Sequence, residues 1–389
     1  MTPLHPSLEY VLIAAIAAAV SFLLTPLMRR LAMLFGAVAK PRDRDVHAVA
    51  IPRMGGVAIL TGLAAALFMA SRLPTLHKAF DSGPEIGWVL LSGALICGLG
   101  VLDDRFELDS LTKLAGQVFA TAIMVTRGGV QLAFIYVPWA DSGTVSLGRD
   151  LAIPVTIALT VITINAINFI DGLDGLAVGV TAIGAGAFFL YSYHLAQADF
   201  IEVAAAPTLL TAALLGACVG FWPHNFFPAR IFMGDSGSML VGLMLSASAI
   251  TATTTADPQV FSNTVGSIPL AMPLLIPIAV LIIPFVDLLL AVARRVGHGQ
   301  APWAPDKRHL HHRLLELGHS HRRAVLLLYF WAALLAFGGV GVAIVRGPWV
   351  LLGGIAVGAV FGVVVLLVPR LRRGRSRPVG AVPVRAVER

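Results

Sequence analysis

The amino-acid sequence predicts an all-α fold, a polytopic bundle of transmembrane helices. Of its 389 residues, 57% are hydrophobic and only 13% are charged. A soluble domain carries about 25% charged residues, so this chain has too little charge to cover a surface that faces water. Both cysteines, Cys97 and Cys218, lie inside apolar runs. Their number excludes a disulfide framework, and we expect both to be small core residues.

Eleven apolar segments approach the roughly 20 residues that a helix needs to cross a bilayer. They are Tyr10–Leu27, Gly55–Ala70, Ile86–Leu102, Leu114–Val125, Leu151–Ile167, Leu176–Tyr193, Pro207–Phe221, Ser238–Thr251, Ile268–Ala291, Ala324–Val345 and Val350–Val368. The fourth is short, so the sequence predicts 10 or 11 spans. We expect the first to be an anchor, because it is too long for a cleaved signal peptide.

Lys and Arg mark the cytoplasmic side of short loops in membrane proteins. With the N-terminus outside and the C-terminus in the cytoplasm, 23 of the 28 Lys and Arg residues fall on the cytoplasmic side. The predicted organisation is one transmembrane domain, residues 1–369, and a disordered basic tail, residues 370–389. The cytoplasmic motif loops are residues 29–53, 103–113, 169–175, 222–237 and 294–323.

The basic excess is therefore explained by topology. The net charge of +7 attracts anionic lipid, and we expect no nucleic-acid partner. On the opposite side, aromatic and β-branched residues between Gly128 and Arg149 flank Asp141-Ser142-Gly143. This pattern predicts a small external hairpin.

Carboxylates gather at the cytoplasmic mouths of the predicted spans. Asp103, Asp104, Asp171, Asp174 and Asp235 lie at three such mouths, next to glycine-rich turns. A single boundary carboxylate is ordinary interfacial capping. Five at three mouths favour a functional cluster, because charge inside or beside a membrane is costly.

The first mouth holds the adjacent pair Asp103 and Asp104. Neighbouring side chains on a helix point about 100° apart, so the pair is expected to have two roles, such as a metal or phosphate contact and a proton acceptor. Lys113 opens the next span. Its ammonium group is suited to meet an anion, and the alternative is a lysine that snorkels to the interface.

The second and third mouths are glycine-rich. Asp171 and Asp174 stand three residues apart in Asp-Gly-Leu-Asp-Gly, and such hard oxygen ligands suit Mg²⁺. A Ca²⁺-like loop and a simple turn are the alternatives. Asp235 lies at a helix start in Gly-Asp-Ser-Gly-Ser, which indicates either a metal ligand beside a phosphate-binding terminus or a helix cap. Phe232 either stacks on a planar ring or packs in the core.

The longest cytoplasmic loop carries a basic histidine motif. His309, His311, His312 and Arg313 lie in Asp-Lys-Arg-His-Leu-His-His-Arg. Three histidines can bind zinc, but the flanking Lys and Arg residues repel a cation. Diphosphate binding fits better, and a solvated basic helix is the alternative.

Together these motifs resemble the polyprenyl-phosphate N-acetylhexosamine-1-phosphate transferases of the glycosyltransferase 4 family, WecA/TagO-like branch. The matching stretches occur in the family's order along most of the chain. They are Ile51–Gly56, Asp103–Asp104, Asn168–Gly175, Phe232–Ser238 and His309–Arg313. The resemblance implies that a polyprenyl phosphate attacks a UDP-N-acetylhexosamine, giving a polyprenyl-diphospho-sugar and UMP. It also implies a need for Mg²⁺, with Mn²⁺ as an alternative.

The resemblance further implies residue roles. It makes Asp103 and Asp104 the catalytic pair at the lipid phosphate, and Asp235 and Asp174 the metal ligands. The substrate-binding residues it implies are Lys113, Asn168, Asp171, Asn225, Phe232, His309, His311, His312 and Arg313. Direct attack and a two-step covalent route are both compatible with this set.

Leu310 interrupts the histidine run. Within the family, this spacing resembles that of the branch that transfers N-acetylglucosamine phosphate. One alternative is phospho-N-acetylmuramoyl-pentapeptide transfer. Secondary transport is a remote alternative, because transporters place charged sites near the middle of the bilayer and only Asp287 lies well inside a predicted span. The expected partners are UDP-N-acetylglucosamine, undecaprenyl or decaprenyl phosphate and the membrane, with a homodimer as one option. The expected location is a bacterial plasma membrane.

Overall fold

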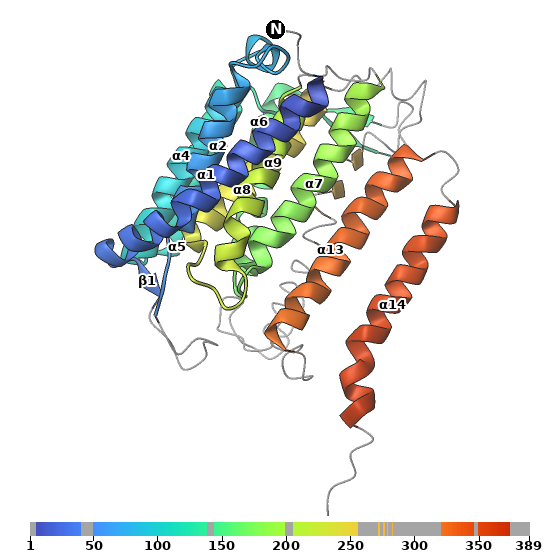
Figure 1. Cartoon of the computed structure of the whole chain (residues 1–389). Coiled ribbons are helices and arrows are strands. Elements are labelled where there is room, and N and C mark those ends of the chain that lie inside the picture. The colour runs from blue at the N-terminus through green and yellow to red at the C-terminus, as the bar shows by residue number, and fades with distance from the viewer. Residues whose placement is uncertain are drawn as a thin grey trace, which may run out of the picture.

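The computed structural model describes residues 5–39, 50–137, 144–198, 205–255, 271–272, 275–276, 278, 282, 320–345 and 349–373. Most of these residues are helical (Figure 1). The helices are α1 (Pro6–Phe35), α2 (Gly55–Ala70), α3 (Lys78–Asp81), α4 (Glu85–Phe106), α5 (Ser110–Arg127), α6 (Arg149–Ile170), α7 (Leu176–Gln197), α8 (Ala206–Asn225), α9 (Gly234–Thr255), α13 (His321–Ile344) and α14 (Trp349–Arg373).

Two short antiparallel hairpins accompany the helices. Strands β1 (Val38–Ala39) and β2 (Ile51–Pro52) pair between α1 and α2. Strands β3 (Phe134–Tyr136) and β4 (Thr144–Ser146) pair between α5 and α6, with Ile135 opposite Val145. The second pair confirms the hairpin predicted between α5 and α6.

Seven helices in the described part of the chain are long and apolar enough to cross a membrane, which makes this a multi-pass membrane protein. They are α1, α4, α6, α7, α8, α9 and α13. Helix α2 and the apolar part of α14 are shorter. Helix α5, which covers the short fourth predicted span, is not among the seven, and the ninth predicted span lies mostly outside the described residues.

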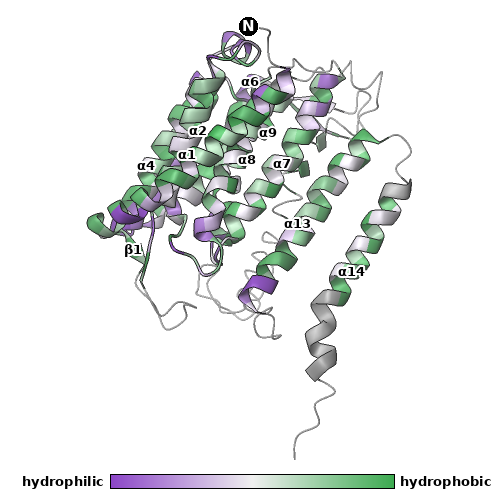
Figure 2. Ribbon diagram, in the orientation of Figure 1, coloured by the Kyte–Doolittle hydropathy of each residue, from purple (hydrophilic) through white to green (hydrophobic). Residues whose placement is uncertain are grey.

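Helix α9 forms the centre of the bundle. It packs against α2, α4, α6, α7 and α8, and its membrane-length stretch is buried throughout. The faces that point outward are largely hydrophobic (Figure 2). This arrangement suits a bilayer, because lipid tails accept apolar side chains while the helices satisfy their own backbone groups.

Small residues bring the helices close together. A Cβ atom on Gly216 or Gly220 of α8 would lie 2.1 Å from the carbonyl oxygen of Ala14 or Ala18 of α1. Such close backbone approach is typical of helix packing inside membranes. The glycines of α8 therefore set its distance from α1.

The helices extend further into the predicted motif loops than the sequence suggested. Helix α1 continues to Phe35, α4 ends at Phe106, α5 begins at Ser110 and α8 continues to Asn225. The predicted loops 29–53, 103–113 and 222–237 are thus shorter, because polar residues at these mouths remain helical. Helix α14 likewise runs to Arg373, into the predicted tail, and residues 294–319 lie outside the described part.

Candidate active site

The start of α9 is held against the start of α2 by backbone hydrogen bonds. The N–H of Phe232 donates to the carbonyl oxygen of Pro52 at 2.8 Å, and the N–H of Gly55 donates to the carbonyl oxygen of Phe232 at 3.1 Å. A Cβ atom on Gly56 would lie 2.3 Å from the backbone nitrogen of Gly237. The motif at residues 51–56 therefore packs directly against the backbone around Asp235.

Asp104 caps α9 from a different helix. Its Oδ1 atom accepts a hydrogen bond from the N–H of Asp235 at 3.0 Å, and its Oδ2 atom accepts one from the N–H of Ser236 at 3.2 Å. These donors belong to the first turn of α9, whose N–H groups lack partners within the helix. Asp104 is buried, with 5% of its surface exposed.

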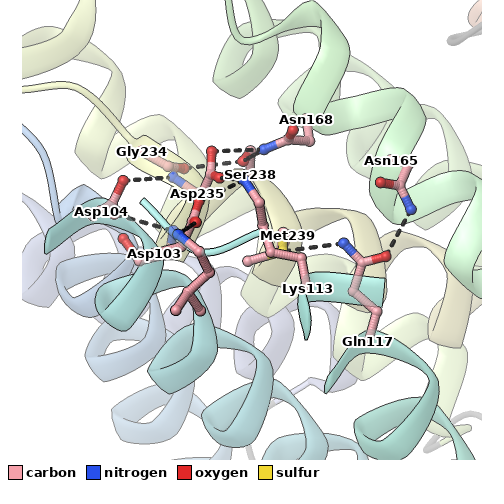
Figure 3. Close-up of polar contacts among 12 residues, drawn as sticks. Asp103, Asp104, Lys113, Gln117, Asn165, Asn168, Gly234, Asp235, Ser238 and Met239 are labelled. Atoms are coloured by element: carbon pink, nitrogen blue, oxygen red, sulfur yellow. Dashed lines mark hydrogen bonds and ion pairs between the residues drawn. The ribbon is translucent and has the colours of Figure 1, made fainter. Parts of the chain in front are cut away.

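Asp103 has different contacts, as expected for adjacent residues on a helix. Its Oδ1 atom accepts a hydrogen bond from the N–H of Leu108 at 2.8 Å, which closes the turn between α4 and α5. Its Oδ2 atom lies 2.8 Å from Nζ of Lys113. The same ammonium group lies 3.0 Å from Oδ2 of Asp235 (Figure 3). Lys113 therefore bridges the carboxylates of α4 and α9.

Helix α6 supplies a second contact to Asp235. The Nδ2 atom of Asn168 donates to Oδ1 of Asp235 at 2.9 Å and contacts Oγ of Ser238 at 2.8 Å. Figure 3 shows these side chains converging on the start of α9. Sequence reasoning missed Ser238 as a contact, although it follows Asp235 by three residues and so lies on the same face of the helix.

An amide pair, the buried Gln117 and the part-buried Asn165, lies one helical turn deeper. The Nδ2 atom of Asn165 donates to Oε1 of Gln117 at 2.7 Å, and Nε2 of Gln117 contacts Sδ of Met239 at 3.3 Å. Gln117 follows Lys113 by four residues and Asn165 precedes Asn168 by three, so each lies on the same helix face as its partner in the site. These spacings of four and three residues were the sequence pattern from which the contact between Gln117 and Asn165 could have been predicted.

The turn between α6 and α7 is tied to the connection between α8 and α9. Oδ2 of Asp174 accepts a hydrogen bond from the N–H of Ala229 at 2.9 Å. The buried amide of Asn225 accepts from the N–H of Gly175 at 3.1 Å and donates to the carbonyl oxygen of Ile231 at 3.0 Å. These contacts hold the turn that carries Asp171 and Asp174 next to the segment that leads to Asp235.

Asp171 experiences the negative charge of the site. Burial and the nearby carboxylates of Asp235, Asp104 and Asp174 raise the pKa of Asp171 to about 8, while the guanidinium group of Arg53 opposes the rise. Sequence reasoning included Arg53 only as part of a motif and did not identify it as a neighbour of these carboxylates. The part of the shift that comes from the neighbouring carboxylates, and not the part that comes from burial, is what an added cation would offset.

The structure therefore brings together most of the predicted site. Asp103, Asp104, Lys113, Asn168 and Asp235 form one connected group. Asp174 and Asn225 join the adjoining turn, and the backbone of Phe232 anchors the start of α9. His309, His311, His312 and Arg313 lie outside the described residues.

The donor set fits Mg²⁺. Within the described part of the chain, no three carboxylates or histidines form a ready-made metal cluster. Mg²⁺ does not require one, because it usually binds one or two carboxylates and completes its shell with water and phosphate. Asp235 is still part-exposed, with 26% of its side-chain surface accessible, and hard carboxylate oxygens outnumber the cations around it.

Comparison with known proteins identifies the family of this chain. A family model described as glycosyl transferase family 4 matches residues 86–253. The decaprenyl-phosphate N-acetylglucosaminephosphotransferase of Mycolicibacterium smegmatis is 46% identical over 374 residues, which are 95% of this chain and 90% of the relative. The probable undecaprenyl-phosphate N-acetylglucosaminyl 1-phosphate transferase of Bacillus subtilis is 32% identical, over 79% of this chain and 77% of the relative.

A third relative has a different named substrate. The phospho-N-acetylmuramoyl-pentapeptide-transferase of Desulforudis audaxviator is 31% identical, over 85% of this chain and 98% of the relative. The matched region of the family model runs from α4 to α9 and so contains α4, α5 and α6, which supply the described contacts to Asp235. The similarity extends along nearly the whole chain, and the chain therefore belongs to glycosyl transferase family 4.

Proposed function

We propose that this protein transfers N-acetylglucosamine-1-phosphate from UDP-N-acetylglucosamine to undecaprenyl or decaprenyl phosphate. The products are polyprenyl-diphospho-N-acetylglucosamine and UMP, in the first membrane step of a cell-envelope polysaccharide. The observation that carries the proposal is the meeting of Asp103, Lys113, Asn168 and Asp235 at one end of a membrane bundle. Relatives similar along nearly the whole chain carry the names of such transferases.

The reaction exchanges one phosphoanhydride for another. An oxygen of the lipid phosphate forms a bond to the sugar-linked phosphorus of UDP-N-acetylglucosamine. The bond from that phosphorus to the oxygen of the UMP group breaks, and the electron pair leaves with UMP. Catalysis of this kind depends on positioning the two phosphates and neutralising their charge, which is the chemistry that this side-chain set can supply.

Each charged residue receives a role from its contacts. Lys113 approaches both Asp103 and Asp235, so its ammonium group stands at the carboxylate site where it can also bind a substrate phosphate. Asp103 holds Lys113 in place from the α4 side. Asp104 acts through the first turn of α9, because both of its oxygens already accept backbone hydrogen bonds.

Asp235, with Asp174 as the second ligand, would hold Mg²⁺. When bound, Mg²⁺ neutralises and orients the diphosphate. Asn168 fixes the Asp235 carboxylate in place through a hydrogen bond at 2.9 Å. Asp171, Asn225 and Phe232 are proposed to contact the nucleotide, and His309, His311, His312 and Arg313 are proposed to bind the diphosphate.

The site faces the cytoplasm of a bacterial cell in this proposal. UDP-sugars are water-soluble substrates, whereas the polyprenyl phosphate is confined to the membrane. Asp103, Lys113 and Asp235 lie at helix ends, where both can be reached. The basic side of the charge asymmetry is the same side as these residues, as the positive-inside rule requires.

The direct test is release of UMP by purified protein with Mg²⁺, a polyprenyl phosphate and a panel of UDP-sugars. We expect rapid release from UDP-N-acetylglucosamine and little from UDP-N-acetylmuramoyl-pentapeptide. The higher similarity to N-acetylglucosamine-phosphate transferases supports this choice. Faster turnover of the pentapeptide substrate would assign the protein to the other activity, and uptake of solute without UMP release would indicate a transporter.

A further inference from the structure

Helix α13 contacts both the α8–α9 connection and the turn between α6 and α7. At its start, the ring of His321 stacks on Phe227, with 4.5 Å between ring centroids. The Nε atom of the adjacent Arg322 donates to the carbonyl oxygen of Phe227 at 3.2 Å. These contacts hold α13 against the connection between α8 and α9. The same connection contains Ala229, whose N–H donates a hydrogen bond to Asp174.

Tyr329 extends this contact to the turn before α7. It follows His321 by eight residues, or about 12 Å along a helix. Its hydroxyl donates a hydrogen bond to the carbonyl oxygen of Gly175 and accepts one from Nε1 of Trp222 at 3.0 Å. Three helices, α7, α8 and α13, therefore meet at this hydroxyl group.

Gly179 allows the ring of Tyr329 to approach. A Cβ atom at Gly179 would lie 2.1 Å from Cζ and from the hydroxyl oxygen of Tyr329. The ring therefore rests against the first turn of α7 at a position where any larger residue would displace it. The hydroxyl is consequently held in one place relative to α7.

Gly175 is fixed from two directions. It has a positive φ of 79°, which favours glycine. Its N–H donates to Asn225 at 3.1 Å, and its carbonyl oxygen accepts from Tyr329 as well as from the N–H of Gly179 at 3.0 Å. The peptide groups on both sides of Gly175 therefore have set orientations, and Asp174 precedes it directly.

We infer that Tyr329 is a positioning residue for the turn at residues 171–175. Its hydroxyl fixes the Gly175 carbonyl group, and this in turn holds the backbone from which Asp174 projects. The inference rests on the proposed function only for the reaction that the turn serves. The hydrogen bonds to Gly175 and from Trp222 are independent of that reaction.

Tyr329→Phe tests this role, because it removes the hydroxyl and keeps the ring against Gly179. Tyr193→Phe is the matched control, since it makes the same chemical change near the far end of α7. We expect faster hydrogen–deuterium exchange at residues 171–179 in Tyr329→Phe than in the control, with the cooperative thermal unfolding transition retained. The free energy of one lost hydrogen bond corresponds to a change of roughly tenfold in an equilibrium constant. The Mg²⁺ and UDP-N-acetylglucosamine concentrations for half-maximal UMP release should therefore rise by about this factor.

A second variant tests the chain of contacts. Trp222→Phe removes the donor to the Tyr329 hydroxyl together with part of the indole ring that packs on Phe226. Because the hydrogen bond from Tyr329 to Gly175 remains, we expect the same changes at smaller size. Exchange and half-saturating concentrations equal to those of Tyr193→Phe would overturn the inference, as would faster exchange without any kinetic change. If the wild-type protein releases no UMP, the proposed function fails, and the exchange comparison with and without Mg²⁺ alone decides whether Tyr329 sets the turn.

Discussion

The carboxylate of Asp104 caps α9, accepting a hydrogen bond at 3.0 Å from the N–H of Asp235 in the first turn of that helix. These residues are 131 positions apart in the chain. A Cβ atom at Gly100, one turn before Asp104, would lie 2.3 Å from the backbone of Ser236. The end of α4 and the start of α9 are thus in direct backbone contact, and the place of Asp235 depends on α4.

Gly100→Ala should separate these helices. The added methyl group meets backbone atoms that cannot rotate away, and such overpacking costs about 1–3 kcal/mol. We expect a lower thermal midpoint in detergent and a large loss of UMP release. Gly98→Ala is the control, because a Cβ atom there has no described neighbour within 4 Å. Equal behaviour of the two variants would contradict the close contact.

Asp235→Asn should abolish transfer while preserving the fold. Asn and Asp are about equally good at helix starts, and an amide oxygen can still accept from Lys113. The negative charge that would hold Mg²⁺ is lost, so we expect UMP release to fall by orders of magnitude. The measurement is activity against Mg²⁺ concentration at matched protein levels, beside Asp103→Asn, whose Mg²⁺ requirement should change less. Normal turnover with an unchanged Mg²⁺ requirement would leave Asp235 as a structural residue.

Lys113→Met should have the opposite effect on the metal. Removing the ammonium group frees oxygens of Asp103 and Asp235 that now lie 2.8 Å and 3.0 Å from it. Uncompensated carboxylates attract a divalent cation more strongly. We therefore expect turnover to fall at least about a hundredfold while the Mg²⁺ concentration for half-maximal rate decreases. Lys113→Arg keeps the charge and should retain part of the activity; a raised Mg²⁺ requirement in Lys113→Met would show that the lysine does not compete with the metal.

The pH dependence of Mg²⁺ binding should report on Asp171. Its pKa of about 8 means that, without a cation, the carboxyl group carries a proton below that pH. A cation favours the charged form, so its binding releases the proton and becomes easier as the pH rises from about 7 to about 9. We expect the half-saturating Mg²⁺ concentration to decrease over this range. In Asp171→Asn this dependence should flatten, and an equally steep dependence there would assign the titration to another group.

Cysteine labelling tests the orientation. Ser110 at the start of α5 and Ser82 before α4 are both exposed and lie at opposite ends of α4. In intact cells, an impermeant thiol reagent should label Ser82→Cys but not Ser110→Cys. The native Cys97 and Cys218 are buried and give little background. Labelling of Ser110→Cys in sealed cells would place the site on the outer face.

The helices and the general position of the site could be predicted because both depend on local sequence. A long apolar run predicts a helix, and a carboxylate at its end marks a mouth. The partners of each carboxylate could not be predicted, since Lys113 and Asp235 are 122 residues apart. The same limit hid the capping role of Asp104 on α9.

Some features had no sequence signal at all. Tyr329 lies in an apolar run and resembles any packed aromatic residue until its contact with Gly175 is seen. Helix ends were also misplaced: Asn225 belongs to α8 and not to a loop. Hydrophobicity defines where a helix crosses the bilayer, whereas hydrogen bonds among polar residues decide where it stops.

The arrangement of Asp235 among α4, α5 and α6 has a consequence for how the protein is made. A chain is synthesised from its N-terminus, so Asp103, Lys113 and Asn168 enter the membrane before the segment Gly234–Thr255 leaves the ribosome. Until then these side chains lack the carboxylate that unites them. A product interrupted after α6 therefore contains most of the polar groups but is inert, and the ability to consume the lipid carrier arises in a single late stage of biosynthesis.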